Sequence, residues 1–474
     1  MRWRRLGLFV LGLCLLVGVA LFAITTSNRG KLRRQLKEIE ERGDLVVLPH
    51  TAETEGGRAS HEWLRQFDNA EGDENEWSLD REEGVARFLE LPEAQRLDEQ
   101  ARAQLRILSA CIAREDHDRP EAHSHGLLQD GVPPEQWDEC ERAFLVACEL
   151  AYPRLQELLR GEIPSEPLDP EPGPGLMRIP QHIPWLSSAV RAVLLPTHAM
   201  LERGDAAGVS ARIKKAVQLD ALYSRQVSLI ALLARVLFTE RAVAVARMAL
   251  AQLPPDAALD SLEPLLAGIE DQRTQFHRAL LEERAMMNEC FEQVRDGDAP
   301  LGDPASGLFA TLLSFDQPYF LATFAEAIEL SRSDSPVHIG AGIGQLDERI
   351  RAHFDSWRKY TTPLAAFLLP RFMDSWHALQ DERAMADLVR LGLRVRRLPA
   401  QDALAEVAHS SDPYTEQPFH ARMETDGHLT LWSVGRNLQD DGAPTHQELE
   451  RDGETASFQR KFERDDLVVR VRMR

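Results

Sequence analysis

The chain has 474 residues, of which 43% are hydrophobic and 28% charged, and its net charge is −21. This length fits two or three domains, and this composition is typical of a globular chain rather than a disordered one. Such an excess of acid repels phosphate backbones, so we expect no nucleic-acid partner.

The N-terminus carries the strongest pattern. Three arginines in residues 1–5 precede residues 6–26, an uncharged run long enough to cross a bilayer as one helix. A cleaved signal peptide usually has a shorter apolar core and a small-residue cleavage site, which Leu21 and Phe22 spoil here. We therefore predict an uncleaved transmembrane helix with the lipid bilayer as its partner. Basic residues flank the run on both sides, so the positive-inside rule leaves its orientation open.

The rest of the chain divides by composition and periodicity. A charged helix from Lys31 to Arg42 is followed by a polar, acidic stretch that favours a tether with at most short helices. Apolar residues then recur at the three- and four-residue spacing of a buried helix face. We expect a basic N-terminus (1–5), a transmembrane helix (6–26), a charged helix and polar tether (27–84), a first helical segment (85–160), a proline-rich linker or surface loop (161–178), a helical domain (179–400) and a β module (401–474).

Two helices of the helical domain have distinct patterns. Residues 228–253 are apolar almost all round, but Arg235, Glu240 and Arg241 argue against a second membrane span, so we predict a buried central helix. Residues 362–398 predict a long amphipathic helix whose start Pro370 kinks. Its apolar stripe consists of Leu368, Phe372, Trp376, Leu379, Leu388, Leu391 and Val395.

The period changes near Ser411, where alternating residues predict three short strands. Asp426-Gly427 marks a tight hairpin turn between the first two strands. A sheet this small needs a helix to pack on, and the long helix ending near Leu398 is the obvious support. The expected fold is mainly α: an N-terminal transmembrane helix, a soluble domain of helical hairpins and a small C-terminal antiparallel sheet.

The stretch LWSVGRNLQDDG, after the second predicted strand, is the candidate cation site. Calcium takes six to eight oxygen ligands, and Asn437, Asp440 and Asp441 supply such oxygens, while Asp466 precedes the last strand. The spacing is not that of an EF-hand. A solvated acidic turn is the alternative.

The C-terminal quarter resembles the major pseudopilins of type II secretion. The matching positions are Asp412, Pro413, Tyr414, Pro418 and Phe419, then Ser433, Gly435 and Asn437, and finally Asp466 and Leu467. The resemblance implies a small sheet of pseudopilin type and calcium binding in the loop after the turn. Asn437 stands where the family usually has aspartate, which lowers the ligand charge.

The N-terminus departs from that family. A pseudopilin has glutamate at the fifth position of its apolar helix, whereas the fifth residue after Gly7 is Gly12. We therefore expect no pilus subunit. The whole layout is similar to a set of bacterial membrane-anchored helical proteins, a likeness that implies no particular activity.

Other motifs are weaker. The spacing of His117, His123 and His125 can bind zinc or copper, but it is also typical of a polar loop. The glycines of HIGAGIG do not follow a predicted strand, so we expect no phosphate cradle. The pairs Glu282-Glu283 and Asp381-Glu382 are expected on solvated helix faces. Cys111, Cys140, Cys148 and Cys290 form no CxxC motif and are expected to be buried thiols.

These patterns favour a non-enzymatic, single-pass membrane protein. We expect a scaffold or interaction module of the cell envelope with an extracytoplasmic soluble part, a protein partner and, apart from calcium, no cofactor. The alternative is a membrane-anchored hydrolase whose site is assembled from distant residues, perhaps including His117 to His125.

Overall fold

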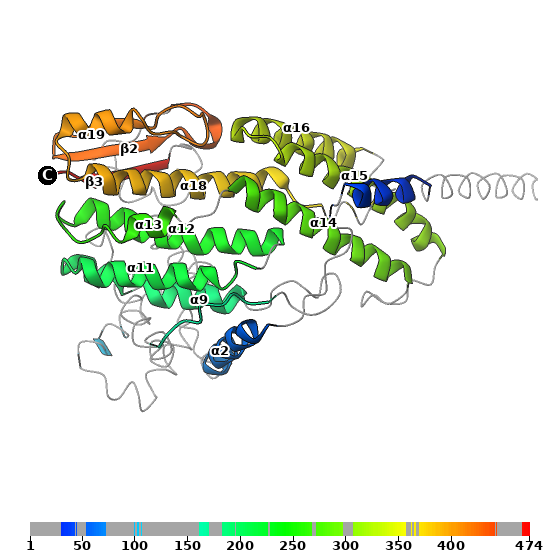
Figure 1. Ribbon diagram of the computed structural model, residues 1–474, viewed down its shortest axis with the longest axis horizontal. Helices are drawn as coiled ribbons and strands as arrows, with labels where there is room; N and C mark the ends of the chain where they lie inside the picture. The colour runs from blue at the N-terminus through cyan, green and yellow to red at the C-terminus, as the bar shows by residue number, and fades with distance from the viewer. Residues whose placement is uncertain are drawn as a thin grey trace, which may run out of the picture.

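The computed structural model describes residues 30–42, 44, 54–72, 99, 102–103, 106, 161–169, 183–194, 196–225, 228–267, 272–296, 307–356, 362, 365, 369–440, 442 and 467–474. They form a mainly helical protein with a small three-stranded antiparallel sheet, which confirms the expected fold class at this level (Figure 1). Within these ranges no helix has the length and apolar character needed to cross a membrane. The predicted transmembrane helix, the histidines of residues 117–125 and most of residues 85–160 lie outside them.

The helices follow one another along the chain with short connections. A helix at 30–41 comes first. It is followed by α2 (Glu55–Gly72), α9 (Ile183–Leu194), α10 (Thr197–Glu202), α11 (Ala206–Ala221), α12 (Leu229–Gln252), α13 (Leu262–Ala267), α14 (Gln272–Asp296), α15 (Gly307–Ser331), α16 (Pro336–Asp355), α18 (Phe372–Val395) and α19 (Ala400–Val407). Figure 1 shows α9, α11, α12 and α18 stacked side by side, with the sheet beyond α18 and α14–α16 at the other end.

Side-chain caps set several helix starts. Asp205 accepts a hydrogen bond from the Gly208 amide at the start of α11, and Ser228 accepts one from the Ala231 amide at the start of α12. These oxygen atoms satisfy amides of the first turn that have no partner within the helix. The caps explain why each helix begins directly after its turn.

Helix α12 is the buried central helix that the sequence predicted. Its buried residues lie on every side, and Arg241 is only 1% exposed. The Arg241 guanidinium donates to the backbone oxygen of Ser187 at 3.2 Å and to its Oγ at 2.9 Å. A cation within the helix is therefore bound to α9 rather than solvated.

Helix α12 takes part in two hydrophobic cores. Leu232, near its start, belongs to a core built mainly from α14, α15, α16 and the first turns of α18. Phe238 and Leu250, further along, belong to a core built from α9, α11, the later turns of α18 and the sheet. The two long helices α12 and α18 thus join both cores.

The apolar stripe predicted for α18 is confirmed. Six of its members are buried, and the seventh, Leu368, lies outside the described residues; the six are Phe372, Trp376, Leu379, Leu388, Leu391 and Val395. The predicted kink at Pro370 is wrong, because α18 begins at Phe372, beyond the proline. A proline inside the helix would remove one backbone hydrogen bond, and the chain avoids that cost by starting the helix later.

The sheet has the strand order β1-β2-β3, with β1 at His420–Met423, β2 at His428–Ser433 and β3 at Leu467–Arg472. The predicted turn is confirmed: Gly427 has a φ of 84°, and its amide donates to the Glu424 oxygen at 3.3 Å. One face of the sheet is fully buried against α12 and α18 through Leu429, Leu431, Val469 and Val471. The long helix therefore supports the sheet, as the sequence predicted.

Two segments expected to be exposed are packed instead. The predicted tether contains α2, an 18-residue helix in place of the short helices expected there. Residues 161–169 of the proline-rich segment contribute Ile163 and Leu168, 7% and 1% exposed, to the first core. Apolar side chains between the prolines account for this packing, because burying them stabilises an otherwise irregular segment.

Glycines Gly340 and Gly342 lie inside α16. A Cβ at Gly340 would lie 3.2 Å from Nε1 of Trp376, and one at Gly342 would collide with the Leu330 side chain. These glycines therefore allow close contact between helices, in agreement with the expectation that HIGAGIG is no phosphate cradle.

The expectation of solvated carboxylate pairs is wrong for one member of each pair. Glu283 is 4% exposed, and Glu382 is 6% exposed. Neighbouring helix positions point about 100° apart, so one residue of each pair turns inward. Burial raises the pKa of Glu283 to about 7, although its carboxylate accepts a hydrogen bond from the Leu229 amide at 3.0 Å.

Glu382 belongs to a buried acidic cluster between α11, α12 and α18. Arg235 of α12 pairs with Asp220 of α11, with Nε 3.3 Å from Oδ1. Burial and the Asp220 charge raise the pKa of Glu382 to about 7, against a hydrogen bond with Thr239. Since Asp220 and Glu240 also lie near the single Arg235 guanidinium, the cluster favours keeping a proton on Glu382.

This arrangement predicts a pH-dependent stability. Between pH 4.5 and about 7 the folded protein keeps the Glu382 proton that the unfolded chain loses, so the free energy of unfolding falls as pH rises through this window. Glu382→Gln should remove up to about 3 kcal/mol of that fall. Urea unfolding of the full-length protein in detergent at several pH values measures it.

The matched control is Glu348→Gln, an exposed glutamate on α16. Its unfolding curve should keep the wild-type dependence on pH. Equal slopes for Glu382→Gln and wild type would contradict the assignment.

Candidate functional site

The predicted cation site follows β2, around a short 3-10 helix, η5 (Gly435–Asn437). Asn437 and Asp440 are described there, whereas Asp441 and Asp466 lie outside the described residues. Asn437 Oδ1 accepts a hydrogen bond from the Gln439 amide at 2.8 Å. In the part of the chain that the structure covers, no three His, Cys, Asp or Glu side chains form a group suited to a metal.

Asp440 is bound to the sheet. Its Oδ1 accepts hydrogen bonds from Trp432 Nε1 at 2.9 Å and from the Gly442 amide at 3.1 Å, and its Oδ2 lies 3.3 Å from His420 Nδ1. The Trp432 bond in particular lowers the pKa of Asp440, despite a smaller opposing effect of burial. Asn437 and Asp440 therefore already bind N–H donors, and these two residues alone do not supply a calcium ligand set.

Asp412 lies under this loop and is 1% exposed. Its Oδ1 accepts from the Tyr414 amide at 2.9 Å and its Oδ2 from the Val434 amide at 3.2 Å. Burial raises its pKa, whereas hydrogen bonds from Tyr414, Ser433 and Val434 oppose that rise. The carboxylate thus joins two segments that the pseudopilin resemblance had singled out separately.

Tyr414 and Arg436 fasten the same loop to α18. The Tyr414 hydroxyl donates to Asp381 Oδ1 at 2.5 Å, and Arg436 Nε donates to Asp381 Oδ2 at 2.8 Å. The sequence analysis missed this role of Asp381 because its partners lie 33 and 55 positions away. The polar-aromatic element beginning at Asp412 was the one signal that could have suggested it.

Leu438 stands out in this fixed loop. Its side chain is 55% exposed and its φ is 57°, in the left-handed region that bulky residues rarely adopt. Asp440 follows two residues later, and Arg436 precedes it by two. A strained, exposed leucine is thus held between two residues that anchor the loop to the sheet and to α18.

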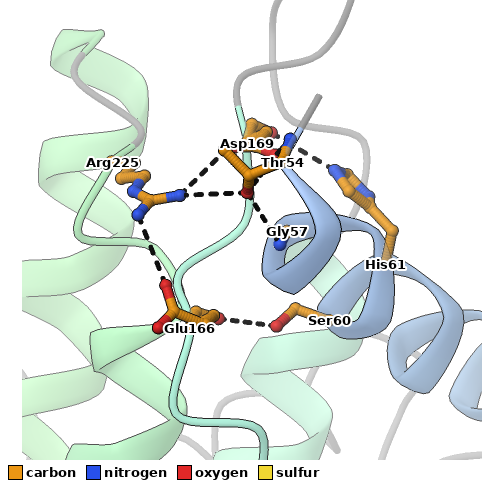
Figure 2. A network of polar contacts seen from close by, with 7 residues as sticks. All are labelled: Thr54, Gly57, Ser60, His61, Glu166, Asp169 and Arg225. Atoms are coloured by element: carbon orange, nitrogen blue, oxygen red, sulfur yellow. Dashed lines mark hydrogen bonds and ion pairs between the residues drawn. The ribbon is translucent and has the colours of Figure 1, made fainter. Parts of the chain in front are cut away.

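A second polar cluster holds the N-terminal part of the chain on the body (Figure 2). Thr54 precedes α2, and its Oγ1 accepts from the Gly57 amide at 2.9 Å, as an N-cap does. Asp169 Oδ2 accepts from the Thr54 amide at 2.6 Å and from its hydroxyl at 2.9 Å. A Cβ at Gly57 would collide with the Asp169 carboxylate, so the glycine allows this approach.

Arg225, beyond α11, completes the cluster, which we call the N-terminal latch: Thr54, Gly57, Ser60, His61, Glu166, Asp169 and Arg225. Its guanidinium lies 3.0 Å from Asp169 Oδ1 and 3.4 Å from Glu166 Oε2. Ser60 Oγ donates to the Glu166 backbone oxygen at 2.5 Å, and His61 Nε2 lies 3.2 Å from the Asp169 oxygen.

The charge of Asp169 is stabilised in place. Burial alone would raise the pKa of this carboxyl, but hydrogen bonds from Thr54 and the Arg225 guanidinium outweigh it and lower the pKa. The latch therefore stays ionised at neutral pH and joins three segments that are remote in sequence. Sequence reasoning missed it because it treated residues 54–61 as tether and residues 166–169 as linker.

No protein-family model, no curated protein and no solved structure matches this chain. The likeness to pseudopilins therefore stays a prediction from the residues quoted above.

The latch makes a prediction about local opening. Asp169→Ala removes the acceptor of both Thr54 bonds and the partner of Arg225, which should favour local opening of the α2 start by about 1–2 kcal/mol. The Gly57 and Arg58 amides should then exchange with deuterium roughly ten-fold faster. Hydrogen–deuterium exchange of the full-length protein measures this change.

Glu166→Gln is the matched control. Its carboxylate is 56% exposed, and its contact with Ser60 uses the backbone oxygen, which the substitution leaves intact. Exchange at the same amides should change by less than about two-fold. Similar rates in both variants would show that Asp169 does not hold the segment.

Proposed function

We propose that this protein is a non-enzymatic, membrane-anchored scaffold of the cell envelope. Its helical body presents the C-terminal sheet module (residues 401–474) to a protein partner. The observation that carries the proposal is Leu438, an exposed apolar side chain in a strained backbone conformation on a loop fixed from two sides.

The physical argument concerns cost. A left-handed conformation costs a residue with a Cβ roughly 1–2 kcal/mol, and an exposed leucine regains little of that by burial. Such a position is supported when the exposed side chain contributes binding energy to a partner that covers it. Arg436 and Asp440 hold the loop before the partner arrives, which reduces the entropy lost on binding.

The polar clusters of the body support the same role. The N-terminal latch, the buried acidic cluster and the contacts of Asp412 and Asp381 each join segments distant in sequence. A scaffold needs such joints, because a contact loop on a loose body would lose its fixed position. An extracytoplasmic soluble part fits a loop braced by calcium, which is abundant outside the cytoplasm.

Leu438→Asn tests the contact. Asparagine tolerates the left-handed conformation, so relief of strain should offset lost contacts and keep the unfolding free energy within about 1 kcal/mol of wild type. A photo-crosslinking residue in place of Thr425 or His409, on either side of the loop, should trap one envelope protein in the Leu438 background and not in the Leu438→Asn background. Immunoblotting and mass spectrometry identify the trapped chain.

Leu404→Gln is the control, because this leucine of α19 is also exposed, at 39%, but lies in a helix. It should leave the trapped product unchanged. Loss of the product in both variants, or in neither, would contradict a specific role for Leu438. A hydrolytic activity in the purified full chain would contradict the non-enzymatic proposal.

Calcium binding in the loop is part of the same proposal and needs Asp441 and Asp466 to complete the ligands. Calcium at millimolar concentration should raise the melting temperature of the full-length protein by a few degrees, because it binds the folded state alone. Asp466→Asn should abolish the rise, whereas Asp402→Asn, on exposed α19, should not. An unchanged melting temperature in wild type would leave only the solvated turn.

A further inference from the structure

The helix at 30–41 is packed on the body rather than free of it. Ile39 is 6% exposed within the second core, and Leu32 and Leu36 pack against that core. Gln35 Nε2 donates to the Pro318 oxygen of α15 at 3.2 Å. In Figure 1 this helix, in the darkest blue, lies beside α15 at the end of the molecule opposite the sheet.

An ion pair at its C-terminal side fixes this position. The Asp44 amide donates to the Ile39 oxygen at 3.1 Å, and its carboxylate lies 3.5 Å from Arg284 and 3.3 Å from Arg332. The Arg284 side chain is only 2% exposed. Burial lowers the pKa of Arg284 and Asp44 opposes that effect, so releasing Asp44 would remove a counter-charge from a buried guanidinium.

The charges along this helix run against its dipole. Lys31, Arg33 and Arg34 are exposed in the first turns, whereas Glu40 and Glu41 are exposed at the end. A helix is stabilised by the opposite order, with acids first and bases last. Even its Lys37–Glu41 pair, at 3.3 Å, has the less favourable orientation. The order therefore does not serve helix stability, and it fits a negatively charged layer beyond the first turn.

The chain length limits how far that layer can be. The apolar run ends at Thr26, four steps before Gly30, and four extended residues cover at most about 15 Å. If residues 6–26 cross a bilayer, the first turn of the docked helix lies at the headgroups. The body is then held at the membrane by its α14–α16 end.

We propose that the α14–α16 end of the body, with Lys31, Arg33 and Arg34, rests on anionic lipid headgroups and directs the sheet module away from the membrane. This inference rests on the membrane anchor of the proposed function. It adds an orientation and a lipid class. Basic side chains next to a membrane span are attracted to anionic headgroups over roughly a Debye length, about 10 Å at 0.1 M salt.

Fluorescence quenching in liposomes tests the orientation. A genetically encoded fluorescent residue replaces Ala322, exposed on α15 near the docked helix, or Thr425, exposed at the hairpin turn. The full chain is reconstituted with phosphatidylglycerol and spin-labelled headgroups. Quenching should be strong at position 322 and near background at position 425. Equal quenching, or stronger quenching at position 425, would overturn the inference.

Charge and latch variants test the cause. Replacing Lys31, Arg33 and Arg34 by glutamate should lower quenching at position 322 about two-fold or more in anionic liposomes, with little change in phosphatidylcholine alone. Asp44→Asn should lower it in both lipids by releasing the body. The exposed control pair Arg203→Glu and Lys214→Glu should leave it unchanged. A response equal to the control's would overturn the headgroup contact.

Alkaline carbonate extraction separates this inference from the anchor itself. Protein that stays in the membrane fraction but shows the reversed quenching pattern overturns the orientation alone. Protein that the carbonate extracts overturns both the anchor and the orientation, whereas the trapping experiment at Leu438 still tests the partner.

Discussion

The packing of α12 against α18 is the constraint on which the rest of the structure depends. A Cβ at Gly392 of α18 would lie 2.9 Å from side-chain atoms of Leu250 on α12 and of Val471 on β3. Both long helices cross from the second core into the first, so their contact fixes the two cores relative to each other. The sheet is a small structure with little stability of its own, and it depends on this helix pair.

The sequence predicted the elements whose signal is local. The all-round apolar pattern of α12, the stripe of α18 and the alternation of the strands depend on neighbours within a few turns, and each was confirmed. The start of α18 was missed because Pro370 was taken as a kink, although a proline is cheaper before a helix than inside it. The packing of residues 54–72 and 161–169 was missed because composition indicates solubility, whereas a few apolar side chains decide burial.

The candidate sites were harder to predict, because their partners are remote in sequence. Asp381 meets Tyr414 and Arg436 only after α18, the loop and the sheet have assembled. The residue types around Asp412 did indicate a constrained turn, and the structure joins Asp412 to Val434 there. Two of the four predicted calcium ligands are described, and their oxygen atoms serve the loop itself.

Burying charge normally costs stability, so a chain that buries several charged groups does so for position rather than energy. In this protein the buried or half-buried charges lie where segments meet: Asp44 with Arg284, Asp169 with Arg225, and Asp220 with Arg235. Apolar contacts alone would tolerate small sliding of these segments, whereas an ion pair with hydrogen-bond geometry defines one arrangement. The N-terminal helix and the sheet module are consequently tied to the same pair of helices, so the anchor at one end and the contact loop at the other are separated by a fixed body.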